Sequence, residues 1–222
     1  MVTADPAMIE AARAKLYAAV LSDVLDGLGY RHQVLAPAIR PLDDRLVLCG
    51  RARTGLYRDV YHLPPGHNPY ALEIALIDDL KPGEVAVLAC GASGRIAPWG
   101  ELLTTASLAR GAVGCVTDGL VRDIKAIRAL DFPVFCGGIG PLDSKGRGEV
   151  AAIDVPVECA GVAVNPGDLV FGDADGVVVV PQHVAAQAIR LALEKVEGED
   201  RTRDELKAGA LLADVFKKHG VL

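Results

Sequence analysis

Apolar positions change their spacing along the chain, and the changes predict its elements. Near the start they recur every three or four residues, which predicts a helix from about Pro6 to Leu28, with Asp5 able to cap it and Gly27 and Gly29 ending it. An apolar run predicts a strand over 46–56. The Pro-rich and His-containing segment 57–69 predicts a loop, and a helix is expected from there to Asp79.

The centre of the chain alternates between short apolar runs and segments with helical spacing. Strands are expected at 85–88, 113–117 and 133–135, with helices at 101–110 and 122–130 between them. This β-α-β-α-β order is typical of a parallel sheet. Two extended runs over 150–164, a turn at 165–168 and a strand at 177–180 indicate that the second half adds antiparallel strands.

The last segment has too much charge for a core helix. A long helix is expected from about Gln182 to Leu206, and its polarity indicates packing against something outside its own core. We therefore predict a single α/β domain over residues 1–222, with a mixed parallel and antiparallel sheet and helices on both faces. Residues 182–222 are expected to form a C-terminal helical arm that contacts a neighbouring subunit.

Composition narrows the possible partners. The formal charge of −6 and the pI near 5.4 make nucleic acid and anionic membranes unfavourable partners. Neither a signal peptide nor a membrane-spanning apolar run is visible, so a cytoplasmic protein is expected. The five cysteines are widely spaced and are expected to be free thiols, and the five histidines show no metal-ligand spacing.

Segment 91–103 follows a buried strand and opens a helix. A helix start of this kind presents unpaired amides and a partial positive charge, so it is a candidate site for a carboxylate or phosphate. The alternative is that its glycines only satisfy turn geometry. The segment lacks the Gly-Lys-Ser/Thr ending of a P-loop and the dinucleotide Gly-x-Gly-x-x-Gly pattern.

Segment 114–123 repeats the order of strand, turn and helix start, and two such starts after adjacent parallel strands face one crevice. Asp118-Gly119 is most simply a turn. Asp123 has a structural alternative, because a carboxylate in a first turn caps a helix. Arg122 opposes the helix dipole and needs a partner such as Asp123, a carbonyl oxygen or a bound anion.

Arg122 and Asp123 together suit a small 2-oxo acid. The arginine would bind the carboxylate of such a substrate, and the aspartate would hold a divalent cation on its keto oxygen. Hard oxygen ligands favour Mg²⁺ or Mn²⁺. With one protein carboxylate at the metal, water must complete the coordination shell.

Several motifs resemble one family. They are 22–29, Gly100-Glu101-Leu102-Leu103, Asp118 to Asp123, 132–135, 164–168 and 173–177. Together they resemble the RraA-like family, which joins 4-hydroxy-4-methyl-2-oxoglutarate aldolase with ribonuclease activity regulator A. The resemblance implies an αββα sandwich that assembles as a homotrimer or homohexamer. It also implies a class II pyruvate aldolase that releases pyruvate from 4-hydroxy-2-oxo acids and decarboxylates oxaloacetate.

The resemblance also implies roles for particular residues. Backbone amides of Gly100, Glu101, Leu102 and Leu103 would bind pyruvate together with Arg122, and Asp123 would ligate Mg²⁺. Glu101 would assist proton transfer. A glutamate from a neighbouring subunit would hold the metal's waters, with Glu199 as the match and Glu197 as the runner-up.

Two questions stay open at this level. The regulator branch shares the fold without the aldolase activity, so a non-catalytic regulator that binds a protein partner is the alternative function. The loop after 137–140 departs from the better-known aldolases, and Ser144, Lys145 or Arg147 would either contact the distal part of a substrate or lie in solvent.

Overall fold

The structure is a computed structural model that describes residues 4–91 and 93–220. Its helices are α1 (Pro6–Lys15), α2 (Ala18–Gly27), α3 (Ala71–Asp78), α4 (Glu101–Ala109), α5 (Ile124–Ala129), α6 (Ala185–Lys207) and α7 (Leu212–His219). Its strands are β1 (Arg40–Pro41), β2 (Leu48–Asp59), β3 (Glu84–Ala89), β4 (Gly114–Val121), β5 (Val134–Ile139), β6 (Gly148–Ile153), β7 (Val157–Cys159), β8 (Val162–Val164), β9 (Leu169–Asp173) and β10 (Gly176–Val180).

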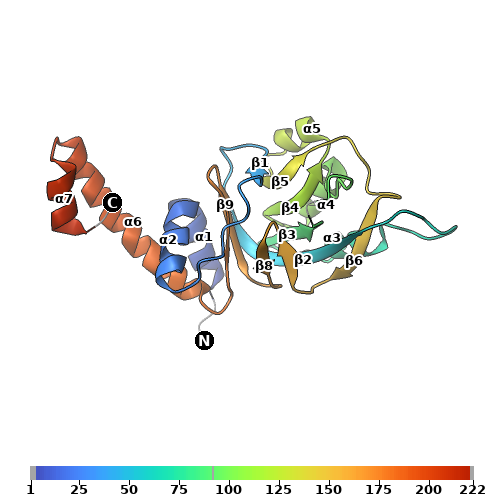
Figure 1. Cartoon of the computed structure of the whole chain (residues 1–222), viewed down its shortest axis with the longest axis horizontal. Coiled ribbons are helices and arrows are strands. Elements are labelled where there is room, and N and C mark those ends of the chain that lie inside the picture. Colours follow the sequence, from blue (N-terminus) through green and yellow to red (C-terminus); the bar gives the residue numbers. More distant parts are fainter. Residues whose placement is uncertain (1–3, 92, 221–222) are drawn as a thin grey trace.

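An eight-stranded mixed sheet organises the chain (Figure 1). Its order is β1-β5-β4-β3-β2-β9-β10, and β6 also pairs with β2. Strands β2 to β5 run parallel, whereas β1, β6, β9 and β10 pair antiparallel with their neighbours. The α/β class, the mixed sheet and the antiparallel second half are therefore confirmed.

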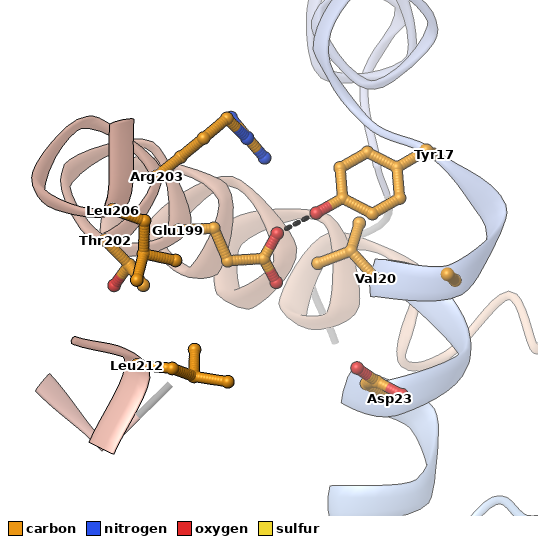
Figure 2. Close-up of a pocket in the computed structure, with 9 residues that line it drawn as sticks. Tyr17, Val20, Asp23, Glu199, Thr202, Arg203, Leu206 and Leu212 are labelled. Atoms are coloured by element: carbon orange, nitrogen blue, oxygen red, sulfur yellow. Dashed lines mark hydrogen bonds between the residues drawn. The ribbon is translucent and has the colours of Figure 1, made fainter. Parts of the chain in front are cut away.

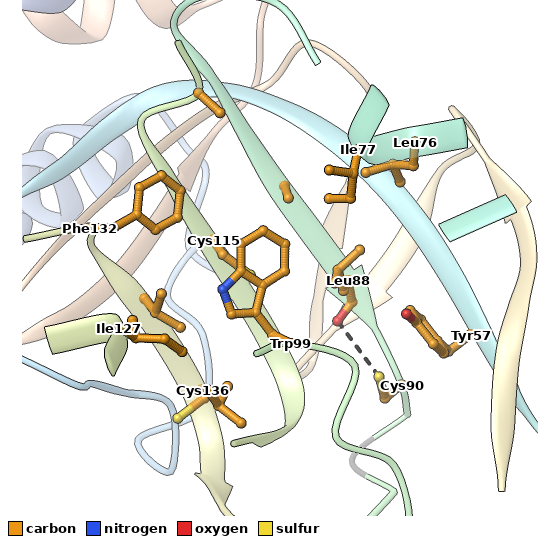
Figure 3. Close-up of a cluster of buried hydrophobic side chains, with 14 of the residues drawn as sticks. Tyr57, Leu76, Ile77, Leu88, Cys90, Trp99, Cys115, Ile127, Phe132 and Cys136 are labelled. Carbon is orange, nitrogen blue, oxygen red and sulfur yellow. Dashed lines mark hydrogen bonds between the residues drawn. The ribbon is translucent and has the colours of Figure 1, made fainter. Parts of the chain in front are cut away.

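Three apolar clusters hold the layers together. Helices α3 to α5 cover the first, which includes Trp99, Leu76 and Ile127 (Figure 3). Helices α1, α2 and α6 pack over β9 and β10 in the second. The third cluster fills the other side of the sheet under the β7–β8 hairpin. Burying this much aliphatic surface is the main driving force for the fold.

The single N-terminal helix expected from Pro6 to Leu28 is wrong, because two helices, α1 and α2, occupy this range. Asp5 does cap α1, since its carboxylate accepts from the Met8 amide at 2.8 Å. The helix then breaks at Leu16 and Tyr17, which are both extended. The Ala18 amide donates to Asp173 at 2.8 Å, so a side chain from a distant strand caps α2.

Two further boundaries differ from expectation. Strand β2 continues to Asp59 through the start of the expected 57–69 loop, because β6 pairs alongside it. Asp118 and Gly119 do not form a turn: they lie within β4, where the register with β5 shifts. The Asp118 carboxylate accepts from the amides of Cys90 and Ala160, so it joins three segments of backbone.

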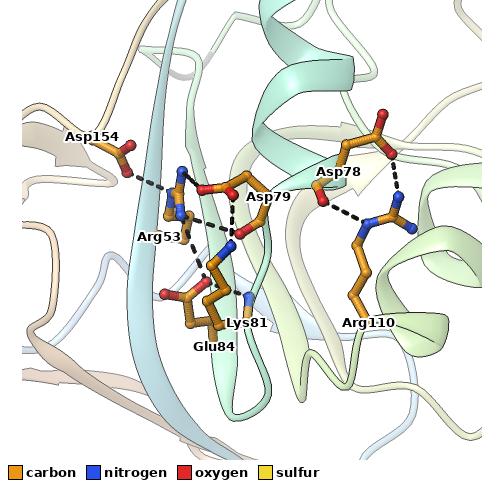
Figure 4. Close-up of polar contacts among 7 residues, drawn as sticks. All are labelled: Arg53, Asp78, Asp79, Lys81, Glu84, Arg110 and Asp154. Carbon is orange, nitrogen blue, oxygen red and sulfur yellow. Dashed lines mark hydrogen bonds and ion pairs between the residues drawn. The ribbon is translucent and has the colours of Figure 1, made fainter.

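A network of ion pairs ties β2, an interior strand of the sheet, to the end of α3 (Figure 4). The Arg53 guanidinium lies 2.6 Å from Asp154 and 2.9 Å from Asp79. Arg110, just past α4, pairs with Asp78. These contacts fix the end of α3, whose first turn contains Glu73 of the candidate site.

The C-terminal helices extend away from the sheet (Figure 1). Helix α6 begins against α1 and α2 and continues beyond them, and α7 folds back on its far end. The expected long helix is confirmed with an end at Lys207, and the rest of the expected helical arm contains a second helix, α7, that was not predicted separately. Within residues 4–91 and 93–220, no helix is both long and apolar enough to cross a membrane.

Candidate active site

Backbone hydrogen bonds join the loop before α4 to the end of β4. The Leu120 amide donates to the Ile96 carbonyl, and the Arg122 amide donates to the Trp99 carbonyl, each at 3.0 Å. The buried Trp99 ring stacks on Phe132, and its indole N–H donates to Thr104 at 2.8 Å. These contacts hold the start of α4 beside Arg122.

Gly100 lies where only a glycine fits without displacing its neighbours. A Cβ there would lie 2.8 Å from Oδ2 of Asp123 and 3.2 Å from Cγ of Arg122. Beside it lies a cavity of about 210 Å³. Its apolar wall contains Ala97, Pro98, Trp99, Leu102 and Leu103, and its polar wall contains Tyr70, Glu73, Arg122, Asp123, Asp143 and Ser144.

Asp123 adopts a left-handed backbone conformation, with φ 59° and ψ 29°. That region is strained for a residue other than glycine, although aspartate tolerates it better than most. Its carboxylate makes no cap to α5; it accepts instead from the Glu101 amide at 3.3 Å. A cap to its own helix α5 is therefore wrong; the carboxylate instead accepts from the first amide of α4, and the residue lines the cavity there.

Arg122 lies between two carboxylates without a close bond to either. Its Nε is 3.8 Å from Oδ2 of Asp123, and its NH1 is 3.9 Å from Oδ2 of Asp143. Both separations exceed hydrogen-bond length. The guanidinium therefore keeps donor capacity for an anion within the cavity.

The open end of α4 supplies amide donors next to the guanidinium. The first intrahelical bond runs from the Thr104 amide to the Gly100 carbonyl at 3.1 Å, so the amides of Leu102 and Leu103 precede the helical pattern. The Glu101 side chain points along its own helix and accepts from Thr105 at 2.7 Å. Of the residues 100–103, Gly100, Leu102 and Leu103 line the cavity, and Glu101 contributes its amide to Asp123.

Sequence reasoning missed Tyr70, Glu73 and Asp143. The Tyr70 hydroxyl lies 3.0 Å and 2.9 Å from the two Asp143 oxygens, and burial together with this bond raises the pKa of Tyr70 to about 12. Glu73 accepts a hydrogen bond from Tyr57, and burial raises the pKa of its carboxyl. The sequence signal available for Glu73 was its place between Leu72 and Ile74 in a predicted helix.

Burial opposes ionisation of Asp143, but hydrogen bonds from the Lys145 amide and from Tyr70 hold its pKa below the ordinary value. Asp143 is therefore charged at neutral pH. In the same loop, Ser144 is buried and lines the cavity. Lys145 is exposed, and Arg147 donates to the Asp143 carbonyl at 3.0 Å, so neither basic side chain lines the cavity.

Glu199 lies in a different cavity of about 360 Å³, between α2 and the C-terminal helices (Figure 2). The Tyr17 hydroxyl donates to its carboxylate, and burial raises its pKa. Glu197 is exposed. One chain therefore does not bring Glu199 together with Asp123.

The remaining candidate ligands form no metal cluster. Within residues 4–91 and 93–220, no group of three or more His, Cys, Asp and Glu side chains is arranged to hold an ion. His67 bonds to Glu149 at 2.6 Å in a surface cluster with Arg58. All five cysteines are free and buried, as expected.

Comparison with known proteins identifies the family. The family model described as RraA-like, Aldolase/RraA, matches residues 18–179. The chain belongs to the RraA-like family. A relative from Halalkalibacterium halodurans, which carries the provisional name 4-hydroxy-4-methyl-2-oxoglutarate aldolase, is 34% identical over 193 residues, 87% of this chain and 85% of its own length.

Solved structures agree with this assignment. An uncharacterised protein from Pseudomonas syringae superposes with a TM-score of 0.84 at 28% identity, covering 97% of this chain and 99% of that one. RraAS2 of Streptomyces coelicolor, described as an unusual member of the RNase ES inhibitor RraA family, superposes at 0.79 and 28% identity over 91% of this chain and 98% of its own. The RraA-like fold is thus confirmed, and its relatives include proteins named for two different activities.

Proposed function

We propose that this protein is a divalent-metal-dependent lyase that cleaves a 4-hydroxy-2-oxo acid to pyruvate and a second oxo compound. That class includes the 4-hydroxy-4-methyl-2-oxoglutarate named for the H. halodurans relative. Oxaloacetate decarboxylation is the expected side activity. The observation that carries the proposal is the placement of Arg122 and Asp123 on one small cavity at the open end of α4, with the Asp123 carboxylate turned away from its own helix.

The donor set at Asp123 fits Mg²⁺ or Mn²⁺. The side chain is half exposed at 49%, and only its Oδ2 accepts from the Glu101 amide. Mg²⁺ commonly binds through one or two carboxylates and keeps several waters, so a site with a single protein ligand suits it. When bound there, the cation would supply positive charge that stabilises negative charge developing on the keto oxygen.

The chain's own residues position the substrate. Arg122 and the amides of Leu102 and Leu103 would bind the 2-oxo acid's carboxylate. In cleavage the C4 hydroxyl loses its proton to water or to a base as the C3–C4 bond breaks. The bond's electron pair passes to the pyruvate fragment, and C3 then gains a proton. Glu101 is a candidate base only if it turns away from Thr105.

Pyruvate release from a panel of 4-hydroxy-2-oxo acids and oxaloacetate, with Mg²⁺ and with excess chelator, tests the proposal. Chelation should abolish turnover, and Asp123→Asn should lower it by at least about 100-fold while weakening Mg²⁺ binding in calorimetry. Asp131→Asn is the control, because Asp131 is also left-handed, at φ 48°, but lies outside the cavity. Full turnover in excess chelator would refute the mechanism. No turnover on any substrate would favour the regulator alternative.

We further propose that the site is completed by Glu199 from a neighbouring subunit of a homotrimer or homohexamer. Two observations support this. Helix α6 carries Glu199 away from its own sheet (Figure 1), and Glu199 lies outside the cavity of its own Asp123. Tyr17 would hold the carboxylate in a fixed orientation.

Mixed oligomers test the shared site. Asp123→Asn and Glu199→Gln proteins should each be weak alone, and refolding them together should restore about a quarter of the sites. A site is intact only when its Asp123 comes from a Glu199→Gln chain and its Glu199 comes from an Asp123→Asn chain. Random assembly gives each of these two conditions one chance in two. If both residues acted within one chain, mixing would restore no activity. Native mass spectrometry would confirm that mixed oligomers had formed.

A further inference from the structure

The wall of the cavity opposite the apolar side chains is built from α3 and the loop before β6. Tyr70 precedes α3 and Glu73 lies within it, while Asp143 and Ser144 come from the loop. The Tyr70–Asp143 hydrogen bond joins the two segments. Arg122 lies between Asp143 and Asp123, so Asp143 is on the side of Arg122 away from Asp123. We therefore call these four residues the distal wall.

The charges along the cavity are unevenly distributed. Among the described residues that line it, Arg122 is the only cation, whereas Glu73, Asp123 and Asp143 are acidic. The substrate's own carboxylate would occupy Arg122, and the divalent cation would occupy Asp123. What remains for the rest of the substrate is a wall with two carboxyl groups, one serine hydroxyl, one tyrosine hydroxyl that is bonded to Asp143, and no basic side chain.

The two basic residues of the loop do not change this distribution. Lys145 is exposed and outside the cavity lining. The Arg147 guanidinium is bonded to the Asp143 carbonyl, so it braces the loop. Since Arg122 would bind the first carboxylate, a second carboxylate on the substrate would face Asp143 with no further basic side chain to offset the repulsion, and like charges brought together in this way disfavour binding.

Resting on the proposed function, we propose that the substrate is a 4-hydroxy-2-oxo acid whose distal part is uncharged and carries hydroxyl groups, as in a 2-oxo-3-deoxy sugar acid. Hydroxyl groups donate hydrogen bonds, and the carboxyl oxygens of Asp143 and Glu73 accept them. Ser144 adds a hydroxyl that both donates and accepts. A cavity of about 210 Å³ is below the range for drug-sized ligands, which suits a substrate of a few carbons.

The test compares two substrates that release the same pyruvate. One is 2-oxo-3-deoxygluconate, whose distal part is an uncharged diol, and the other is 4-hydroxy-2-oxoglutarate, whose distal part is a carboxylate. Pyruvate release gives kcat/KM for each. Because both values come from one enzyme sample, their ratio is independent of the fraction that is correctly folded.

The expected ratio favours the sugar acid by more than about tenfold. Asp143→Asn should lower that ratio at least about fivefold by removing the charge that opposes a second carboxylate. Asp44→Asn makes the same chemical change at an exposed position outside the cavity and should leave the ratio as in the wild type. A smaller wild-type ratio, or a ratio unaffected by Asp143→Asn, would overturn the inference.

Exchange of the pyruvate methyl protons with deuterated water, followed by NMR, separates this inference from the proposed function. Exchange requires only removal and return of a proton at C3, so it does not involve the distal wall. Mg²⁺-dependent exchange together with a preference for the dicarboxylate would leave the lyase in place and refute its substrate class. Absence of exchange and of cleavage of both substrates would refute both proposals.

Discussion

Gly100→Ala tests whether the close approach of α4 to Arg122 and Asp123 organises the site. The backbone there is extended, with φ −155°, so alanine introduces no backbone strain. The added Cβ would lie 2.8 Å from Oδ2 of Asp123, whereas ordinary contact begins near 3.4 Å. The carboxylate must therefore move by about 0.6 Å, the difference between these two distances.

The displacement should affect activity far more than stability. The atoms that the Cβ meets belong to the side chains of Asp123 and Arg122, which can shift by rotating, so we expect a loss of about 1 kcal/mol in unfolding free energy. Misplacing a catalytic group by about 1 Å costs on the order of 100-fold in rate. We expect kcat/KM to fall by roughly 10- to 100-fold.

Gly94→Ala is the matched control, because a Cβ at Gly94 meets nothing within 4 Å. Pyruvate release and urea unfolding should be measured on both variants. A Gly100→Ala enzyme whose kcat/KM stays within about threefold of wild type, with normal Mg²⁺ dependence, would show that Asp123 and Arg122 do not need their present positions.

Two other side chains give distinct outcomes. Arg122→Lys keeps the charge but loses two-pronged binding of a carboxylate, so KM should rise at least about tenfold, and an unchanged KM would remove Arg122 from substrate binding. Burial raises the pKa of the Glu73 carboxyl above its ordinary value of 4.5. Above pH 4.5 the folded protein therefore holds a proton that the unfolded chain has released, so the free energy of unfolding should fall as pH rises from 4.5 through the raised pKa. The free energy of unfolding of Glu73→Gln relative to wild type should therefore rise as pH increases above about 4.5, whereas that of Glu158→Gln, at an exposed position, should not; a difference from wild type that does not change with pH in urea unfolding would contradict this.

Local patterns predicted the central part of the fold well. Strands β3, β4 and β5 each contain a short apolar run, and α4 follows a loop whose order of strand, glycines and helix start is visible in the sequence. These elements depend on nearby residues, because burial on both faces of a parallel strand requires a continuous apolar run. Arg122 and Asp123 were expected to open a helix after a strand that ended at Thr117, whereas β4 runs to Val121 and α5 begins at Ile124.

The parts that were missed depend on distant residues. The break between α1 and α2 is stabilised by Asp173, which is 155 positions from Ala18. The extension of β2 to Asp59 exists because β6 pairs with it. The distal wall brings Glu73 beside Asp143, and no spacing rule connects a helix to a loop about seventy residues away.

Asp123 shows how the structure tests a structural explanation that the sequence left open. A carboxylate at a helix start gains about 0.5–2 kcal/mol by capping, and a right-handed or extended conformation avoids the cost of the left-handed region. Asp123 has the left-handed conformation and makes no cap to α5, so it forgoes both sources of stability at its own helix. Its carboxylate instead lies beside Arg122 and accepts the Glu101 amide at a cavity wall.

The same cavity contains two more departures from local preference. Arg122 lies at a helix start, where the dipole disfavours a cation, and Glu73 is a buried carboxyl. Sequences that specify a stable fold satisfy local preferences almost everywhere, and the exceptions gather where function requires them. Because three exceptions from two separate segments meet at one cavity of about 210 Å³, a purely structural explanation would need a separate reason for each, whereas binding of a small anionic substrate and a cation accounts for Arg122 and Asp123 together.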